Sequence, residues 1–158
     1  MLQNVFRRAV LTTALTIGLS SAAFAADPPS TGLGQAWPNA ADVSVSPNYH
    51  AYVFVLGGIQ YIQINDLNGN VLGSVGTASG QFITLPIGKF AQYVSTPQQP
   101  AAAAGNATPN SSATTVYNDG TTTVTATSMS DGTTRLAASP TVPATTCDDP
   151  AICGTQQN

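Results

Sequence analysis

Glutamate is absent from this 158-residue chain, and only four lysines and arginines accompany its seven aspartates. Arg7 and Arg8 fall in a segment that we expect to be removed, which leaves Lys89 and Arg135 against seven aspartates, a formal charge of −5. Two cations cannot neutralise a run of phosphates, so nucleic-acid binding driven by counterion release is excluded. Attraction to an anionic membrane surface is disfavoured for the same reason.

Histidine is nearly absent as well, since His50 is the only one. A zinc site needs three or four nitrogen, sulfur or oxygen ligands, and no second histidine or glutamate is present to supply them. No G-x-S-x-G segment marks a hydrolase nucleophile, and no glycine-rich loop opens onto a helix to hold a phosphate. We therefore expect no metal, no cofactor and no enzymatic activity. A small hydrolase that uses His50 is the less favoured alternative.

Cysteine occurs twice, as Cys147 and Cys153 in "CDDPAIC". In an exported protein a neighbouring pair is typical of a disulfide, and Pro150 favours the turn that so small a ring requires. A redox-active pair is disfavoured, because a C-x-x-C spacing is missing and the two intervening aspartates raise thiol pKa values. We predict a small structural ring near the C-terminus.

The first 25 residues are typical of an export signal. A basic start with Arg7 and Arg8 precedes an apolar run from Ala9 to Leu19 and a small-residue close at Ala23-Phe24-Ala25. The run is too short for a permanent transmembrane helix. We predict cleavage after Ala25, no stable membrane span afterwards, and a periplasmic or extracellular location.

Composition divides the remaining chain into four parts. Residues 26–36 are a flexible leader rich in proline and glycine, and residues 37–95 hold the mature chain's only tryptophan and all three of its phenylalanines. Residues 96–112 are a Pro/Ala/Ser-rich linker with too few apolar groups to offset the entropy of ordering. Residues 113–158 are a threonine-rich tail. The core must therefore lie within residues 37–95.

Within that core, "AYVFVLGGIQYIQIN" contains two β-rich runs separated by Gly57-Gly58, which predicts a two-residue hairpin. The register pairs Leu56 with Ile59, Phe54 with Tyr61 and Val53 with Ile62. Both faces carry large apolar groups, so at least one face should be covered. We predict that Tyr52, Phe54 and Tyr61 form a binding surface on one face.

Two further runs, "VLGSV" and "QFITLPIG", continue the pattern and complete a four-stranded antiparallel meander. Pro86 marks the last run as an edge or a strand end. The following "GKFAQYV" fits helical and alternating spacing equally, and we expect a short covering segment there. The predicted fold class is all-β, a small four-stranded meander with a largely disordered or marginally β C-terminal tail.

The stretch "INDLNGNVLG" places Asp66, Asn68 and Asn70 at alternate positions, as at the start of a calcium loop. An EF-type loop needs glycine sixth and a bidentate carboxylate twelfth, where this chain has Val71 and Thr77. Asn-Gly between apolar runs predicts a type I′ hairpin turn instead, with positive φ at Asn68 and Gly69.

The tail contains a weak repeat in which Asp119-Gly120-Thr121-Thr122 recurs as Asp131-Gly132-Thr133-Thr134. Asp-Gly between threonine-rich runs favours hairpins, so residues 114–137 either form a three-stranded meander or stay disordered. Such a meander has few apolar residues and would need the main sheet or a partner to stabilise it.

These features favour a non-enzymatic exported binding or envelope-associated protein that uses a sheet face or edge. A core of about sixty residues is marginal alone, which predicts self-association or docking onto another exported protein. A structural accessory that donates threonine-rich strands to a larger assembly is the alternative.

The segments "QINDLNGNV" and "LPIG", within residues 37–97, resemble small exported β-proteins of Gram-negative bacteria that have no assigned function. The resemblance implies an export signal and a β-domain. It carries over no catalytic residue.

Overall fold

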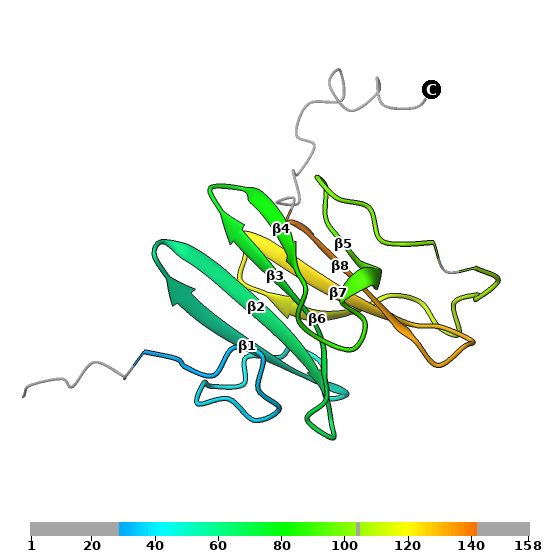
Figure 1. Ribbon diagram of the computed structural model, residues 1–158, viewed down its shortest axis with the longest axis horizontal. Coiled ribbons are helices and arrows are strands. Elements are labelled where there is room, and N and C mark those ends of the chain that lie inside the picture. Colours follow the sequence, from blue (N-terminus) through cyan, green and yellow to red (C-terminus); the bar gives the residue numbers. More distant parts are fainter. Residues whose placement is uncertain (1–28, 104, 142–158) are drawn as a thin grey trace, which may run out of the picture.

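The segment richest in β-branched and aromatic residues forms the first sheet of the protein. In the computed structural model, which describes residues 29–103 and 105–141, this sheet contains β1 (Tyr49–Leu56), β2 (Ile59–Asp66), β3 (Val71–Ala78) and β4 (Gln81–Leu85), shown in Figure 1. The strands pair antiparallel in the order β1-β2-β3-β4, and the predicted meander is confirmed. The export signal, Cys147 and Cys153 lie outside the described residues.

The β1–β2 hairpin has the predicted register, with Phe54 opposite Tyr61 and Leu56 opposite Ile59. Gly57 and Gly58 have φ angles of 60° and 80°. Positive φ at both central residues is the requirement of a type I′ turn, and glycine meets it without steric cost.

The β2–β3 corner is a turn, as predicted, but the type I′ geometry was wrong. Only Gly69 has a positive φ, of 82°, and Asn68 does not share it. Gly69 N–H donates to Asp66 O, and Asp66 N–H donates to Asn70 O, which closes a three-residue loop. A type I turn followed by a left-handed glycine produces this geometry. The register shift between Ile64 and Asn65 is a separate irregularity, in which Leu72 of β3 has no paired residue on β2.

The second sheet comes from the threonine-rich half of the chain. After a 3₁₀ turn η1 (Ala91–Tyr93), the short β5 (Val94–Ser95) pairs parallel with β8 (Thr134–Pro140). β8 pairs antiparallel with β7 (Thr122–Ser128), and β7 with β6 (Thr114–Asn118), which gives the order β5-β8-β7-β6. The meander expected from the repeat is therefore present, and the disordered alternative is wrong for residues 114–140.

The two sheets pack face to face and share one core, visible as the two layers of Figure 1. Gly73 in β3 marks a close approach, because a Cβ there would lie 2.6 Å from Val94 Cγ2 and 2.9 Å from Leu136 Cδ1. Each of the eight strands contributes at least one residue to the buried cluster. Its members are Ala51, Ile62, Ile64, Leu72, Val75, Phe82, Phe90, Val94, Val116, Tyr117, Val124, Ala126, Leu136 and Ala138. The core extends beyond residues 37–95 because the second sheet supplies half of it.

The segment before β1 also departs from expectation. Residues 29–36, predicted as part of a flexible leader, pack against the first sheet, and Thr31 pairs with Asn39 in an isolated bridge. Further on, Val43 N–H donates to Ala51 O and Val45 N–H donates to Val116 O, so this segment joins the edges of β1 and β6. Polar side chains of the first sheet form hydrogen bonds with the backbone of residues 29–36, and the composition of the leader did not predict these bonds.

The predicted linker, residues 96–112, contains no named strand among its described residues. It follows the second sheet through backbone hydrogen bonds such as Ala102 N–H to Gln92 O and Asn110 N–H to Ser128 O. Among the described residues, no helix is long and apolar enough to span a bilayer.

Candidate functional site

The outer face of the first sheet, which points away from the second sheet, carries the three predicted binding residues. Side chains alternate along a strand, so Tyr52, Phe54 and Leu56 share one face of β1. Tyr61, directly opposite Phe54, lies on that face too. The prediction that Tyr52, Phe54 and Tyr61 share a face agrees with this register. Tyr52 and Phe54 are, however, only 5% and 4% exposed, so they offer a partner little surface.

Exposed apolar side chains surround these rings at the hairpin end of the sheet. Phe54, Tyr61, Gly76 and Ile83 occupy one cross-strand row. A Cβ at Gly76 would lie 3.0 Å from Ile83 and 3.5 Å from Tyr61, so the glycine lets both side chains close over it. Leu56 and Ile83 are 73% and 54% exposed. We call this surface the outer apolar strip: Phe54, Leu56, Tyr61, Gly76 and Ile83.

The other half of the same face is polar and covered. Gln63 and Asn65 in β2 are fully buried, and Ser74, opposite Gln63 in β3, is 1% exposed. We call these three residues the amide face. Their cover is the N-terminal segment, defined as residues 29–41.

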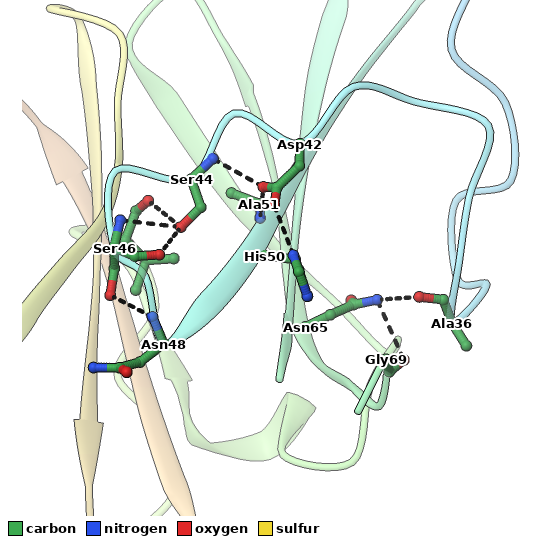
Figure 2. A network of polar contacts seen from close by, with 10 residues as sticks. Ala36, Asp42, Ser44, Ser46, Asn48, His50, Ala51, Asn65 and Gly69 are labelled. Atoms are coloured by element: carbon green, nitrogen blue, oxygen red, sulfur yellow. Dashed lines mark hydrogen bonds and ion pairs between the residues drawn. The ribbon is translucent and has the colours of Figure 1, made fainter. Parts of the chain in front are cut away.

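The carboxamides of the amide face bind the backbone of the N-terminal segment. Gln63 Oε1 accepts from Gly34 N–H at 2.6 Å, and Gln63 Nε2 donates to Gln35 O at 2.8 Å. Asn65 Nδ2 donates to Ala36 O at 2.7 Å and to Gly69 O at 3.3 Å, as Figure 2 shows. A second bond, from Gln63 Nε2 to Asn65 Oδ1 at 2.9 Å, fixes the two carboxamides relative to each other. Ser74 Oγ is buried and has no hydrogen-bond partner within the described part of the chain.

An Asp42–His50 pair fastens the end of the N-terminal segment to β1 (Figure 2). His50 Nδ1 lies 2.6 Å from Asp42 Oδ2, while Asp42 Oδ1 accepts from the backbone N–H groups of Ser44 and Ala51 at 3.0 Å. Partial burial acts to raise the pKa of Asp42, but the hydrogen bonds from His50, Ala51 and Ser44 outweigh it and lower that pKa. The carboxylate therefore stays ionised and the pair stays closed at neutral pH.

Trp37 projects from the N-terminal segment beside this pair. Its ring lies 5.4 Å from the His50 ring in an edge-to-face arrangement, and 59% of the residue is exposed. A Cβ at Gly69 would be 2.6 Å from Trp37 Cε2 and 2.8 Å from each of the two ring atoms Cζ2 and Nε1. Cζ2 and Nε1 are both bonded to Cε2, and an approach in the plane of the ring would bring them closer to the Cβ than Cε2 is. Because Cε2 is the nearest atom, the face of the indole lies against Gly69.

The hydrolase alternative requires a nucleophile beside His50. The hydrogen bonds of the described residues give His50 one partner, Asp42, and the nearby Ser44 hydroxyl donates elsewhere, to Ser46 O and Val116 O. The arrangement fits a clamp on the N-terminal segment.

A second polar cluster joins the two sheets. Gln60 Nε2 in β2 donates to Tyr117 Oη in β6 at 2.9 Å, and Tyr117 donates to Asp119 Oδ2 at 3.0 Å. Burial and the neighbouring Asp119 carboxylate raise the pKa of Tyr117 to about 12. Backbone N–H groups of Thr122 and Thr121 outweigh the effect of burial on Asp119 and lower its pKa. The cluster is a structural bridge with one proton held on Tyr117.

The aspartates of the turns are used as backbone acceptors. Asp66 Oδ1 accepts from the N–H groups of Asn68 and Asn70, each at 2.9 Å, and Oδ2 accepts from the Asn70 side chain at 2.8 Å. Asp131 Oδ1 likewise accepts hydrogen bonds from the N–H and the hydroxyl of Thr133. Within residues 29–103 and 105–141, no three His, Cys, Asp or Glu residues gather as metal ligands would.

An open hollow of about 660 Å³ lies beside β4 and η1. It contains Lys89, whose ammonium group lies 5.1 Å from the Phe90 ring centre. The remaining lining offers amides, a hydroxyl and apolar groups but no titratable acid: Thr84, Leu85, Pro86, Gly88, Ala91, Gln92 and Gln99. Lys89 supplies the positive charge of this lining.

Sequence reasoning missed the amide face and the clamp. Gln63 and Asn65 follow β-rich alternation in "IQYIQIN", and polar residues in such a pattern predict a solvated face. A signal was present, because Leu33 is an apolar residue in the predicted leader and Trp37 begins the next segment.

Comparisons with protein-family models, with curated proteins and with solved structures find no match to this chain. The resemblance to exported Gram-negative proteins therefore remains a prediction that these comparisons do not test.

Proposed function

We propose that this chain is an exported, non-enzymatic binding or envelope-associated protein that contacts its partner through the outer apolar strip. The observation that carries the proposal is the exposure of Leu56 and Ile83, at 73% and 54%, on the face of the first sheet that also carries Tyr61. Exposed apolar patches of this kind mark interaction surfaces, because leaving them in water is unfavourable.

The composition of the strip fits a protein partner. Tyr61 supplies a partly buried ring with a polar end, and Leu56 and Ile83 supply aliphatic surface around it. Aromatic anchors ringed by apolar contacts are typical of protein interface centres. The strip contains no charged residue, so we expect the partner to be an apolar surface of another exported protein, with a second copy of this chain as the alternative.

The strip can be disrupted without disturbing the core. The double substitution Leu56→Asp and Ile83→Asp places two charges on exposed positions, where stability should change by less than about 1 kcal/mol. Incubating the tagged mature protein with the envelope fraction of the producing cell should recover a partner with the wild type and lose it with this variant.

Val55 provides the matched control. It is 69% exposed and adjacent to Leu56, but it points to the opposite face of β1. Val55→Asp should leave partner recovery unchanged. Equal recovery with all three proteins would refute the strip as the contact surface.

Two alternatives have weaker support. The strand-donor role requires the threonine-rich repeat to pair with another molecule, whereas β6, β7 and β8 pair with one another and pack onto the first sheet. A hydrolase that uses His50 has less support, because His50 hydrogen-bonds to Asp42 and the Ser44 hydroxyl donates to Ser46 O within the part of the chain that the structure describes. His50→Ala would be expected to change the docking of the N-terminal segment rather than any hydrolytic activity.

A further inference from the structure

The amide face has the chemistry of a peptide-binding surface. Gln63 contributes one acceptor and one donor to consecutive backbone groups, Gly34 N–H and Gln35 O, and Asn65 adds a donor to Ala36 O. These three bonds address only the main chain of the N-terminal segment. The segment they hold is folded as a turn, because Gln35 N–H donates to Gly32 O. A surface that contacts only the main chain accepts any segment that forms this turn with side chains small enough to fit.

The cover on this surface is weakly attached. No residue from Pro29 to Val45 is buried, although Gln63, Asn65 and Ser74 beneath are at most 1% exposed. The N-terminal segment is thus held by a few hydrogen bonds and the Asp42–His50 clamp rather than by apolar burial. Segments with few buried apolar contacts open locally at low free energy.

The surface itself tolerates uncovering. An apolar sheet face exposed by release of its cover would be penalised in water, whereas carboxamides and a hydroxyl are readily hydrated. Ser74 Oγ, which is buried next to Gln63 and has no partner among the described residues, is a further polar group that water can hydrate. The N-terminal segment and the amide face can therefore separate and bind again at low cost in free energy.

We propose that the amide face is a binding site for an uncharged, turn-forming peptide, that residues 29–41 occupy it reversibly in the same chain, and that the same segment of a second copy can occupy it in trans. The segment "PSTGLGQAWPNAA" carries no charge and places small residues, Gly34 and Ala36, at the contacts. A second copy offers an identical segment, and exchange of identical elements is a low-cost route to a dimer.

The N-terminal segment of the same chain competes strongly with any peptide that binds the amide face in trans, since a tethered segment has a high effective concentration. Exchange therefore requires either high protein concentration or a weakened clamp. Asp42→Ala weakens the clamp without touching Gln63, and His50→Ala breaks the same pair from the other side. Either variant should free the amide face for a peptide added in trans.

The test uses a fluorescein-labelled peptide with the sequence of residues 29–41, titrated into the full mature chain and followed by fluorescence anisotropy. Asp42→Ala should bind the peptide at least about tenfold more tightly than the wild type, because the fraction of open sites rises. Adding Gln63→Leu should abolish that binding. Thr125→Val, on β7 of the other sheet, should change nothing.

Light scattering of the same proteins tests whether two copies exchange their N-terminal segments and form a dimer. Asp42→Ala should form dimers whose fraction rises with concentration, and Asp42→Ala with Gln63→Leu should stay monomeric. If neither clamp variant, folded by circular dichroism, binds the peptide, or if Gln63→Leu leaves binding intact, the site is refuted. Peptide binding with monomers at every concentration would refute the exchange alone.

These outcomes are independent of the proposed function. The Leu56→Asp and Ile83→Asp substitutions lie in the outer apolar strip and leave Gln63 and Asn65 in place. That double variant should bind the peptide as the wild type does, so loss of envelope partners and loss of peptide binding are separate results.

Discussion

Single glycines decide how closely side chains approach each other in this protein. Gly69 combines a left-handed backbone, with φ of 82°, with an indole face against it. Gly58 has nearly the same φ, 80°, and nothing within 4 Å of a Cβ. The two positions therefore separate the cost of backbone strain from the cost of a blocked contact.

Replacing each glycine with alanine should give unequal losses. Gly58→Ala should lower the free energy of unfolding by about 1–2 kcal/mol through the left-handed conformation alone. Gly69→Ala should cost about 1 kcal/mol or more beyond that, because the new methyl displaces Trp37. Urea denaturation gives both values, and Trp37, the only tryptophan, should change its emission only in Gly69→Ala. Equal losses with unchanged emission would show that Trp37 does not rest on Gly69.

A second residue-level effect concerns pH. The pKa of Tyr117 is raised from its ordinary value of 10 to about 12, so the folded state favours the neutral phenol. A group whose pKa rises on folding contributes stability that is complete below its unfolded pKa and is lost as pH increases. The free energy of unfolding should therefore decline between about pH 10 and 12.

Tyr117→Phe isolates this effect from the other groups that titrate in that range. The variant lacks the phenol that Gln60 and Asp119 contact, so its stability should fall less than that of the wild type between pH 9 and 11. Denaturant titrations at the two pH values provide the difference. Parallel declines in both proteins would mean that the Gln60–Tyr117–Asp119 bridge does not hold the proton.

At the scale of elements, the hairpins were predictable because their determinants are local. Gly57-Gly58 and the two Asp-Gly pairs specify turns through residues that directly adopt or cap them, as Asp119 and Asp131 do. The three-residue loop found in place of a type I′ turn at Asn68 and Gly69 was not predictable in the same way, because its length depends on how β2 pairs with β3.

Elements that depend on distant partners were predicted less well. The threonine-rich strands have few apolar residues of their own, and only packing against Ile62, Ile64 and Val75 makes Val124 and Leu136 core residues. Likewise, the N-terminal segment appeared to have nothing to bury, because its partners are the carboxamides of Gln63 and Asn65. The shared face of Tyr52, Phe54 and Tyr61 followed from alternation, but their burial depended on neighbours that alternation does not reveal.

At the scale of the whole molecule, the second sheet determines which surface of the first remains available. It covers much of the inner face through one core, and the N-terminal segment covers the amide face, whereas Leu56 and Ile83 of the outer apolar strip remain exposed. A separate, dispensable tail would leave the inner face bare and move the proposed contact surface.

Native-state hydrogen exchange on the full mature chain tests this arrangement most directly. If both sheets share one core, the slowest amides of β2, such as Ile62 and Ile64, and those of β7, such as Val124, should open only by global unfolding. Their opening free energies should agree with each other and with the value from denaturant titration. Exchange of the β7 amides at a free energy several kcal/mol below that of β2 would contradict the account.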